Sequence, residues 1–213
     1  MNQFRAFAYR ASKNQMHTIW VLKCDVRKFF ASIDQKLLME IVSQYIPDAD
    51  IQWLIRQVVG SFHSTEPGKG LPLGNLTSQL FVNVYMNELD QFVKHTLKAK
   101  YYVRYADDFI VMSTARTCLE GLIPRIAHFL DKRLALSLHP DKLFSKTLSS
   151  GVDFLGWVHF PDHRVLRTAT KRRMLRRLEE NPAEPTLQSY RGMLLHGNGH
   201  KLGGAIERDC PGR

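Results

Sequence analysis

Two adjacent aspartates, Asp107 and Asp108, lie between two segments rich in aromatic and β-branched residues, 101–105 and 109–112. Because aspartate is disfavoured inside a strand, the pair is expected at the tip of a β-hairpin with residues 106–108 as its tight connection. Carboxylates on a rigid support are typical ligands of Mg²⁺, whose shell is completed by water and substrate phosphate. The alternative is an ordinary solvated turn, since aspartate also stabilises turns through local backbone hydrogen bonds.

A third aspartate, Asp25, directly follows residues 19–24, a short apolar run typical of a buried strand. The order strand, helices, hairpin, helix, strand predicts an α+β fold: an antiparallel, ferredoxin-like sheet of the split βαβ type with helices on one face. In this topology Asp25 lies beside the hairpin tip, so we expect the three carboxylates to converge. Each pair would repel by about 1–4 kcal/mol at ~4 Å, and bound cations would remove that conflict. Two magnesium ions about 4 Å apart support an in-line displacement at phosphorus.

The remaining elements are expected from apolar periodicity and from turn residues. Ser32 or Asp34 caps the first helix, and Thr77 or Ser78 begins the longest one. Pro124 delays or kinks the helix that contains it. The other expected elements are a helix or loop over residues 1–18, helices over 51–59, 117–134 and 171–181, and strands over 152–160, 164–167 and 136–144, the last interrupted by residues 139–141.

The 213-residue chain is 44% hydrophobic, enough to bury a core, and carries 30 Lys and Arg against 20 Asp and Glu, a net charge of +10. This surplus favours a polyanionic partner such as nucleic acid, the alternative being a basic protein without one. The three cysteines, Cys24, Cys118 and Cys210, show no paired spacing, which favours a reducing compartment. No apolar run reaches the roughly 18 residues of a membrane span, so we expect a soluble, cytoplasmic protein with no membrane partner.

Five motifs occur in the order and spacing of the palm blocks of reverse transcriptases. They are Asp25 with Phe29 and Phe30, the loop of residues 70–79, Tyr-Ala-Asp-Asp at 105–108, Leu-His-Pro-Asp-Lys at 138–142 and Phe-Leu-Gly-Trp at 154–157. The chain therefore resembles an RNA-directed DNA polymerase over most of its length. The resemblance implies RNA-templated DNA synthesis by nucleotidyl transfer to a primer 3′-OH, with two Mg²⁺ ions, or Mn²⁺, as cofactors. It implies an RNA template, a DNA or RNA primer and dNTPs as partners, and leaves an accessory protein subunit open.

The resemblance assigns a role to each matching residue. Asp25 and Asp107 bind both metals, Asp108 participates more weakly, and Lys142 protonates the leaving pyrophosphate unless it is simply solvated. Arg104, which no motif explains, either contacts phosphate or lies on an exposed strand face. The implied nucleotide-binding residues are Phe29, Phe30 (the steric gate against a ribose 2′-OH), Leu73, Gly74 and Gln79, and the implied primer- and template-binding residues are Tyr105, Phe154, Leu155, Gly156, Trp157, Arg172, Arg173 and Arg176.

The loop of residues 70–79, which we call the glycine loop, indicates a particular type of reverse transcriptase. Its Leu73-Gly74 and Ser78-Gln79 pairs are similar to those of diversity-generating retroelements, which copy template adenines with frequent errors; a group II intron or retron type is the alternative. Reverse transcriptases carry further fingers ahead of the block that starts at residue 19, so a truncated, non-catalytic nucleic-acid-binding remnant is the rival interpretation. The expected parts are a remnant of fingers at 1–18, a palm at 19–160 with a fingers-like helical insertion at about 34–70, and a short hairpin and basic helix at 161–213 that start a helical thumb.

Overall fold

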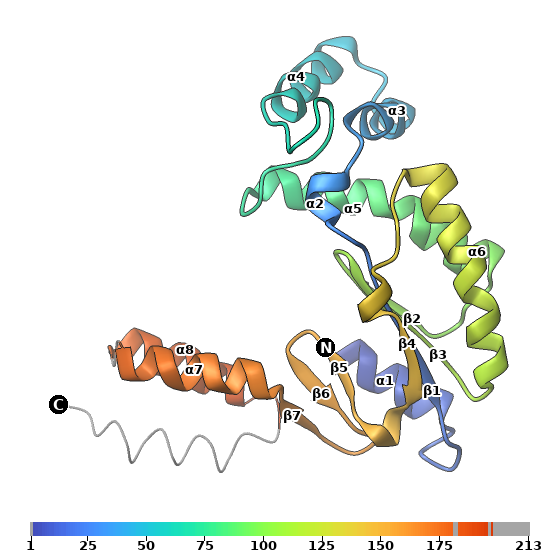
Figure 1. Cartoon of the computed structure of the whole chain (residues 1–213), viewed down its shortest axis with the longest axis vertical. Coiled ribbons are helices and arrows are strands. Elements are labelled where there is room, and N and C mark those ends of the chain that lie inside the picture. Colours follow the sequence, from blue (N-terminus) through green and yellow to red (C-terminus); the bar gives the residue numbers. More distant parts are fainter. Residues whose placement is uncertain (1, 181–182, 196, 198–213) are drawn as a thin grey trace.

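The structure is a computed structural model that describes residues 2–180, 183–195 and 197. Its central sheet has four antiparallel strands in the order β2-β3-β1-β4 (Figure 1). The strands are β1 (Trp20–Asp25), β2 (Tyr102–Tyr105), β3 (Asp108–Ser113) and β4 (Phe144–Thr147). This order, with helices between β1 and β2 and between β3 and β4, is the split βαβ topology that the sequence predicts, so the fold-class prediction is confirmed.

Two long helices cover one face of this sheet. Strand residues such as Leu22 and Val111 point toward these helices and form a continuous core with them. The Tyr85 hydroxyl donates to the Leu134 carbonyl at 2.6 Å and ties the two helices together, and Pro124 lies inside the second helix without ending it. No helix in the described part of the chain is long and apolar enough to cross a membrane. The helices are α5 (Leu76–Gln91), which continues as a π-helix (Phe92–Thr96), and α6 (Arg116–Leu134).

A short helix and a second sheet cover the opposite face (Figure 1). Because successive strand side chains point to opposite faces, Val21 and Ile110 pack on this side, against Phe4 and Ala8 of the helix and Phe154 of the sheet. The sequence predicts helices on one face only, and the structure adds an N-terminal helix on the other. These elements are α1 (Asn2–Ala11) and the antiparallel strands β5 (Val152–Phe154), β6 (Trp157–His159) and β7 (Arg164–Leu166), in the order β5-β6-β7.

Three helices follow β1 and precede α5. Asp34 caps the second of them by accepting a hydrogen bond of 3.0 Å from Leu37 N, as one of the two predicted caps. Asp48 caps the third by accepting from Asp50 N and Ile51 N, each at 3.0 Å. The second helix packs against α5, so this insertion shares the core of the helix-covered face. The helices are α2 (Phe29–Ser32), α3 (Gln35–Tyr45) and α4 (Ala49–Gly60).

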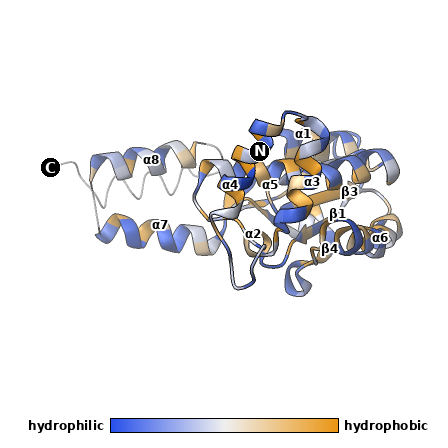
Figure 2. Ribbon diagram, turned by 90° about the horizontal axis from the view of Figure 1, so that it is seen from above, coloured by the Kyte–Doolittle hydropathy of each residue, from blue (hydrophilic) through white to orange (hydrophobic). Residues whose placement is uncertain are grey.

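Two further helices follow β7 and lie alongside each other, projecting from one side of the sheets (Figure 1 and Figure 2). They share a small apolar cluster of Met174, Leu178, Leu187 and Leu194, while hydrophilic residues predominate along the first helix (Figure 2). The first helix confirms the predicted basic helix but begins earlier, and the second is not predicted from the sequence. They are α7 (Thr168–Glu180) and α8 (Glu184–Leu194).

The last strand of the central sheet lies later in the chain than the sequence predicts. Before the interruption predicted at residues 139–141, Leu138 forms an isolated bridge to Val26. A short 3₁₀ helix follows at the interruption, and β4 begins only at Phe144. Pro140 begins this helix because it has no N–H to donate to a neighbouring strand. The single strand predicted over residues 152–160 is also wrong, since it is a hairpin of β5 and β6. The 3₁₀ helices are Pro140–Lys142 and Leu148–Ser150.

Candidate active site

The aspartate-bearing hairpin has a connection of two residues, Ala106 and Asp107, rather than the three predicted. Tyr105 pairs with Asp108 at the ends of β2 and β3, so Asp108 belongs to the strand. Ala106 has a φ of +52°, a left-handed conformation that costs an L-residue roughly 1–2 kcal/mol. Arg104 Nη1 donates a hydrogen bond of 3.0 Å to the Ala106 carbonyl. Asp107 therefore lies in a short turn, and the Arg104 side chain fixes the backbone carbonyl of the residue before it.

The sheet register places the aspartates of β1 and β3 side by side. Asp25 pairs directly with Asp108 across the two antiparallel strands, and Asp107 is the adjacent turn residue. A lysine is bound to each of the two strand carboxylates. Lys142 Nζ lies 2.9 Å from Asp25 Oδ1, and Lys23 Nζ lies 3.1 Å from Asp108 Oδ2. The fold thus brings three acids and two lysines into one neighbourhood, which we call the acid–lysine cluster.

The two lysines do not fully compensate the acids of this cluster. Burial is the largest influence on Asp108 and raises its pKa to about 6; the negative charges of Asp25 and Asp107 act in the same direction, and the Lys23 ammonium opposes them. Burial likewise raises the pKa of Asp107, with Asp25 adding to the shift and Lys142 and Lys23 opposing it. A further positive charge at this place would stabilise the ionised carboxylates.

One oxygen of the cluster lacks a partner. Asp108 Oδ1 is buried and accepts no hydrogen bond from the described residues, whereas buried carboxylate oxygens normally do. An unpartnered carboxylate oxygen beside two further carboxylates fits a hard divalent cation such as Mg²⁺. Within residues 2–180, 183–195 and 197, no three His, Cys, Asp or Glu side chains are already gathered as a metal site. A cation would therefore have to draw Asp25 and Asp107 together and displace Lys142.

Asp108→Asn is expected to remove the contribution of Asp108 to the pH dependence of stability between about pH 4 and about pH 6, while the contribution of Asp107 remains. Because the pKa of Asp108 is raised to about 6 in the folded protein, the folded form holds a proton there that the unfolded chain has already released. The free energy of unfolding of the wild type therefore falls as the pH rises through this window, by up to about 3 kcal/mol.

Urea denaturation in EDTA at several pH values measures this dependence. The matched control is Asp131→Asn, because the Asp131 side chain is 66% exposed and its removal should leave the wild-type profile unchanged. Parallel profiles for the wild type and Asp108→Asn would show that the Asp108 carboxylate is not desolvated as described.

The glycine loop runs beside the residues that follow β1. Leu71 N donates to the Phe30 carbonyl and Gly70 N to the Ile33 carbonyl, both at 2.8 Å. Gly70 has a φ of +96°, and a Cβ at this position would lie 2.7 Å from Ser64 Cβ, so glycine is required for the approach. The fold therefore brings Phe30 alongside the start of the loop.

The residues implied in nucleotide binding differ in how far their side chains are exposed to solvent. Phe29 is buried in the core and packs edge-on against half-buried Phe30, with ring centroids 5.5 Å apart. Phe29 therefore supports Phe30 from the core and is not itself accessible. Leu73 is 78% exposed, and Gly74 and Gln79 are exposed as well. An apolar side chain this exposed contributes little to the core and is available to a ligand.

The residues implied in primer and template contacts belong to three separate elements. Tyr105, at the end of β2, is 66% exposed. Leu155 and Gly156 join β5 to β6 with φ values of +52° and +81°, the pattern of a type I′ hairpin turn. Phe154 and Trp157 flank this turn and are buried, so these aromatic rings are not accessible to a ligand. Arg172, Arg173 and Arg176 are exposed on α7, as are Lys171 and Arg177 of the same helix.

Sequence reasoning missed two charged partners near the hairpin. Lys23 binds Asp108, and its signal is a charged residue in the middle of an apolar strand, which implies a specific partner. Arg104 turns toward α5 and forms an ion pair of 2.7 Å with Asp90, with 9% of its side chain exposed. The prediction of an exposed strand face for Arg104 is therefore wrong, and its guanidinium is committed to Asp90 rather than free for phosphate.

Comparison with known proteins places this geometry in a family. The family model described as Reverse transcriptase (RNA-dependent DNA polymerase) matches residues 2–159. Protein YkfC of Escherichia coli is 24% identical over 202 residues, which cover 78% of this chain and 51% of that protein. The group II intron-encoded protein LtrA of Lactococcus lactis is 22% identical over 223 residues, which cover 72% of this chain and 36% of that protein. The chain thus spans about half, or less, of the length of these relatives.

A solved structure shares the fold. Apo telomerase from Candida tropicalis, truncated from its C-terminal domain, superposes with a TM-score of 0.61 and 12% identity, over 78% of this chain and 39% of that one. At this identity the likeness shows the fold alone, and none of these relatives distinguishes the diversity-generating type from an intron-encoded one. With the family model matched across α1, the central sheet and the first two strands of the second sheet, the chain belongs to the reverse transcriptase family.

Proposed function

We propose that this chain is the palm of an RNA-directed DNA polymerase that joins deoxynucleotides to a primer 3′-OH by two-metal nucleotidyl transfer. The observation that carries the proposal is the acid–lysine cluster, in which Asp108 Oδ1 lacks a partner, at the paired ends of β1 and β3 in a chain of the reverse transcriptase family. The net charge of +10 supports an RNA template and a DNA or RNA primer as partners.

Three carboxylates would hold the metal ions. Asp25 and Asp107 would bind two Mg²⁺ ions, or Mn²⁺, and Asp108 would contribute more weakly. When bound, such ions activate the attacking oxygen and neutralise charge on the leaving one. Lys23 keeps its ammonium 3.1 Å from Asp108 Oδ2 and so leaves Oδ1 as the oxygen of that side chain open to a ligand.

Lys142 would supply the proton for the leaving group. Its Nζ lies 2.9 Å from Asp25 Oδ1, and its side chain is 53% exposed, so the ammonium can turn from Asp25 toward a leaving pyrophosphate. The proton then moves from Nζ to the pyrophosphate oxygen whose bond to the α-phosphorus breaks. The Lys142 ammonium would be displaced by a cation bound at Asp25 and so released for this transfer.

Several surfaces would hold the substrates. Phe30, backed by Phe29, would exclude a ribose 2′-OH from the incoming dNTP, and its backbone contact with the glycine loop supports this placement. The exposed side chains of Leu73 and Gln79 would face the nascent base pair, and the exposed Gly74 would let the loop backbone approach it. The residues we propose for the primer and template are Tyr105, the turn of Leu155 and Gly156 supported by Phe154 and Trp157, and Arg172, Arg173 and Arg176.

We assign the parts of the chain within the same proposal. Residues 1–18 would belong to the fingers and residues 19–160 to the palm, with α3 and α4 in the fingers-like insertion at about 34–70. Residues 161–213 would start the thumb, supported by the projecting pair of α7 and α8. Of this last part, residues 181–182, 196 and 198–213 lie outside the described residues.

The cysteines favour a cytoplasmic location within this proposal. Cys24 is buried and free, Cys118 is exposed and free, and Cys210 lies outside the described residues. An exposed free thiol persists in a reducing compartment, where disulfides are rare.

Primer extension by the purified chain on an RNA template, with Mg²⁺ and all four dNTPs, tests the proposal. Templated elongation that EDTA abolishes supports it. Salt-sensitive RNA binding without elongation, even with excess dNTP, would instead identify a non-catalytic nucleic-acid-binding protein. Elongation that occurs only after an accessory protein is added would show that the polymerase is completed by a partner subunit.

We also propose that copying is error-prone at template adenines. The exposed Leu73 offers the nascent base pair no hydrogen-bonding group, whereas glutamine would offer one. Leu73→Gln is therefore expected to lower misincorporation opposite template adenine about five-fold, as one hydrogen bond is worth about 1 kcal/mol. Sequencing of the cDNA products measures the error spectrum. Leu80→Gln on α5, at a side chain that is 62% exposed, is the control, and an unchanged spectrum in Leu73→Gln would favour a group II intron or retron type.

A further inference from the structure

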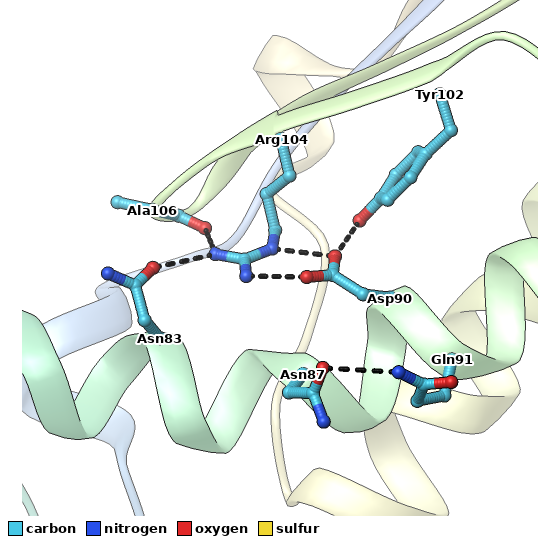
Figure 3. Close-up of polar contacts among 7 residues, drawn as sticks. All are labelled: Asn83, Asn87, Asp90, Gln91, Tyr102, Arg104 and Ala106. Carbon is cyan, nitrogen blue, oxygen red and sulfur yellow. Dashed lines mark hydrogen bonds and ion pairs between the residues drawn. The ribbon is translucent and has the colours of Figure 1, made fainter.

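Arg104 stands at the centre of a polar network between β2 and α5 (Figure 3). Its Nε and Nη2 donate to the two carboxylate oxygens of Asp90, at 2.8 and 2.7 Å. Tyr102 donates its hydroxyl to Asp90 Oδ1 at 2.8 Å. Arg104 Nη1 donates to the Ala106 carbonyl at 3.0 Å and to Asn83 Oδ1 at 3.3 Å. We call these five residues the Asp90 clamp.

The clamp is largely withdrawn from water. Only 9% of the Arg104 side chain and 20% of the Asp90 side chain are exposed. Burial, followed by the negative charge of Asp90, raises the pKa of the Tyr102 phenol well above its usual range, so the hydroxyl remains a donor. A forked, partly buried arginine–carboxylate pair fixes geometry more firmly than an exposed ion pair does. Arg104 could contact a substrate only if its ion pair with Asp90 broke. Any effect of Arg104 on the reaction is therefore exerted through the groups to which it is hydrogen-bonded.

One of those groups is the backbone next to a proposed metal ligand. Ala106 adopts a φ of +52°, which alanine disfavours, and is bonded directly to Asp107. We propose that Arg104 is a positioning residue for metal binding: its Nη1 fixes the Ala106 carbonyl and thereby aims the Asp107 carboxylate toward Asp25. This inference rests on the proposed function of Asp107.

The clamp also relates the hairpin turn to the glycine loop. Asp90 and Asn83 both belong to α5, which begins at Leu76, inside the loop predicted over residues 70–79. Asn75, the last residue before α5, caps this helix by accepting a hydrogen bond of 3.3 Å from Thr77 N. One helix therefore carries the loop at its N-terminal end and holds the turn of Asp107 through the clamp. The glycine loop, proposed to bind the nucleotide, and the turn of Asp107, proposed to bind metal, are therefore both supported by α5.

The test compares Arg104→Lys with Tyr102→Phe in the full chain. Lysine keeps the positive charge but has no fork, so it cannot hold Asp90 and Ala106 together. Tyr102→Phe removes one hydrogen bond to Asp90 and leaves the hydrogen bonds of Arg104 to Asp90, Ala106 and Asn83 in place, which makes it the matched control. Two quantities are measured: the dissociation constant of Mn²⁺ by electron paramagnetic resonance, and the amide hydrogen-exchange rate of residues 101–112.

Arg104→Lys is expected to weaken Mn²⁺ binding about tenfold and to speed exchange in the hairpin about tenfold, because the turn that aims Asp107 becomes a minor population. Tyr102→Phe is expected to stay within about twofold of the wild type in both measurements. Adding Ala106→Gly to Arg104→Lys is expected to restore most of the affinity, because glycine adopts a positive φ without steric cost.

Wild-type affinity or wild-type exchange in Arg104→Lys would overturn the positioning role. So would a loss of affinity that Ala106→Gly leaves uncorrected, because Arg104 would then only tie β2 to α5. If Arg104→Lys does not fold, Asp90→Asn, which keeps an acceptor oxygen but no charge, is judged by the same criteria. Failure of the proposed function is distinguishable: Mn²⁺ would bind the wild type and Asp107→Asn equally, and the exchange rates alone would then decide the role of Arg104.

Discussion

Asp107→Asn is expected to lower RNA-templated primer extension by at least about 1000-fold while leaving the fold intact. Asparagine keeps the shape of the side chain but removes the charge that would hold a metal ion, and metal ions supply several kcal/mol of transition-state stabilisation. Each loss of about 1.4 kcal/mol slows a reaction tenfold. Because burial raises the pKa of Asp107 in the folded protein, its ionised carboxylate opposes folding, and the amide should preserve or increase the free energy of unfolding.

Single-nucleotide extension measures the rate, and urea denaturation measures the stability of the same preparations. Asp50→Asn is the matched control, because Asp50 is exposed in the first turn of α4 and should leave extension within about twofold of the wild type. Asp25→Asn should lower extension as Asp107→Asn does. Equal extension by Asp107→Asn and the wild type would show that the Asp107 carboxylate has no role in catalysis.

Phe4→Ala is expected to lower the free energy of unfolding by about 3–5 kcal/mol, although Phe4 lies in the first helix of the chain. Phe4 is 1% exposed and stacks on His159, with ring centroids 4.1 Å apart, and on Phe154, at 5.8 Å. Helix α1 thus fills the core between the central sheet and the second sheet, and truncating Phe4 leaves a cavity there. Urea denaturation followed by far-UV circular dichroism measures the loss.

Tyr9→Ala on the same helix is the control for this substitution. Tyr9 is 52% exposed, so its removal should change the free energy of unfolding by no more than about 0.5 kcal/mol. If Phe4→Ala were as mild as Tyr9→Ala, α1 would be a loosely attached segment rather than part of the core.

The acids of the acid–lysine cluster could be predicted because each of them follows a local signal. Asp25 ends an apolar strand, and Asp107 and Asp108 interrupt two β-prone runs, so their places in the chain depend on short-range patterns. Their convergence follows from the topology, which the alternation of helices and strands indicates. Asp34 could be anticipated as a helix cap for the same reason, since its hydrogen bond to Leu37 N joins near neighbours.

The ion pairs, strand β4 and helix α8 could not be predicted, because they depend on partners that lie far along the chain. Arg104 and Asp90 are 14 residues apart, and Lys142 and Asp25 are 117 apart. Because the partners are not sequence neighbours, no local pattern predicts these ion pairs. The strand β4 is half-buried at all four positions and lacks the apolar alternation that marks a strand. Helix α8 likewise buries Leu187 and Leu194 in a small cluster with α7 that also includes the partly buried Leu166 of β7.

The two-residue connection between β2 and β3 makes the length of the hairpin as important as its chemistry. One residue added between Ala106 and Asp108 would either bulge outward or slide β3 along β1. Because side chains alternate along a strand, a slide of one position would exchange Ile110, which packs toward α1, with Val111, which packs toward α5. Both cores would be disrupted by a change at the turn. The number of residues in the turn is therefore set by two cores that lie outside it, independently of the chemistry proposed for Asp107.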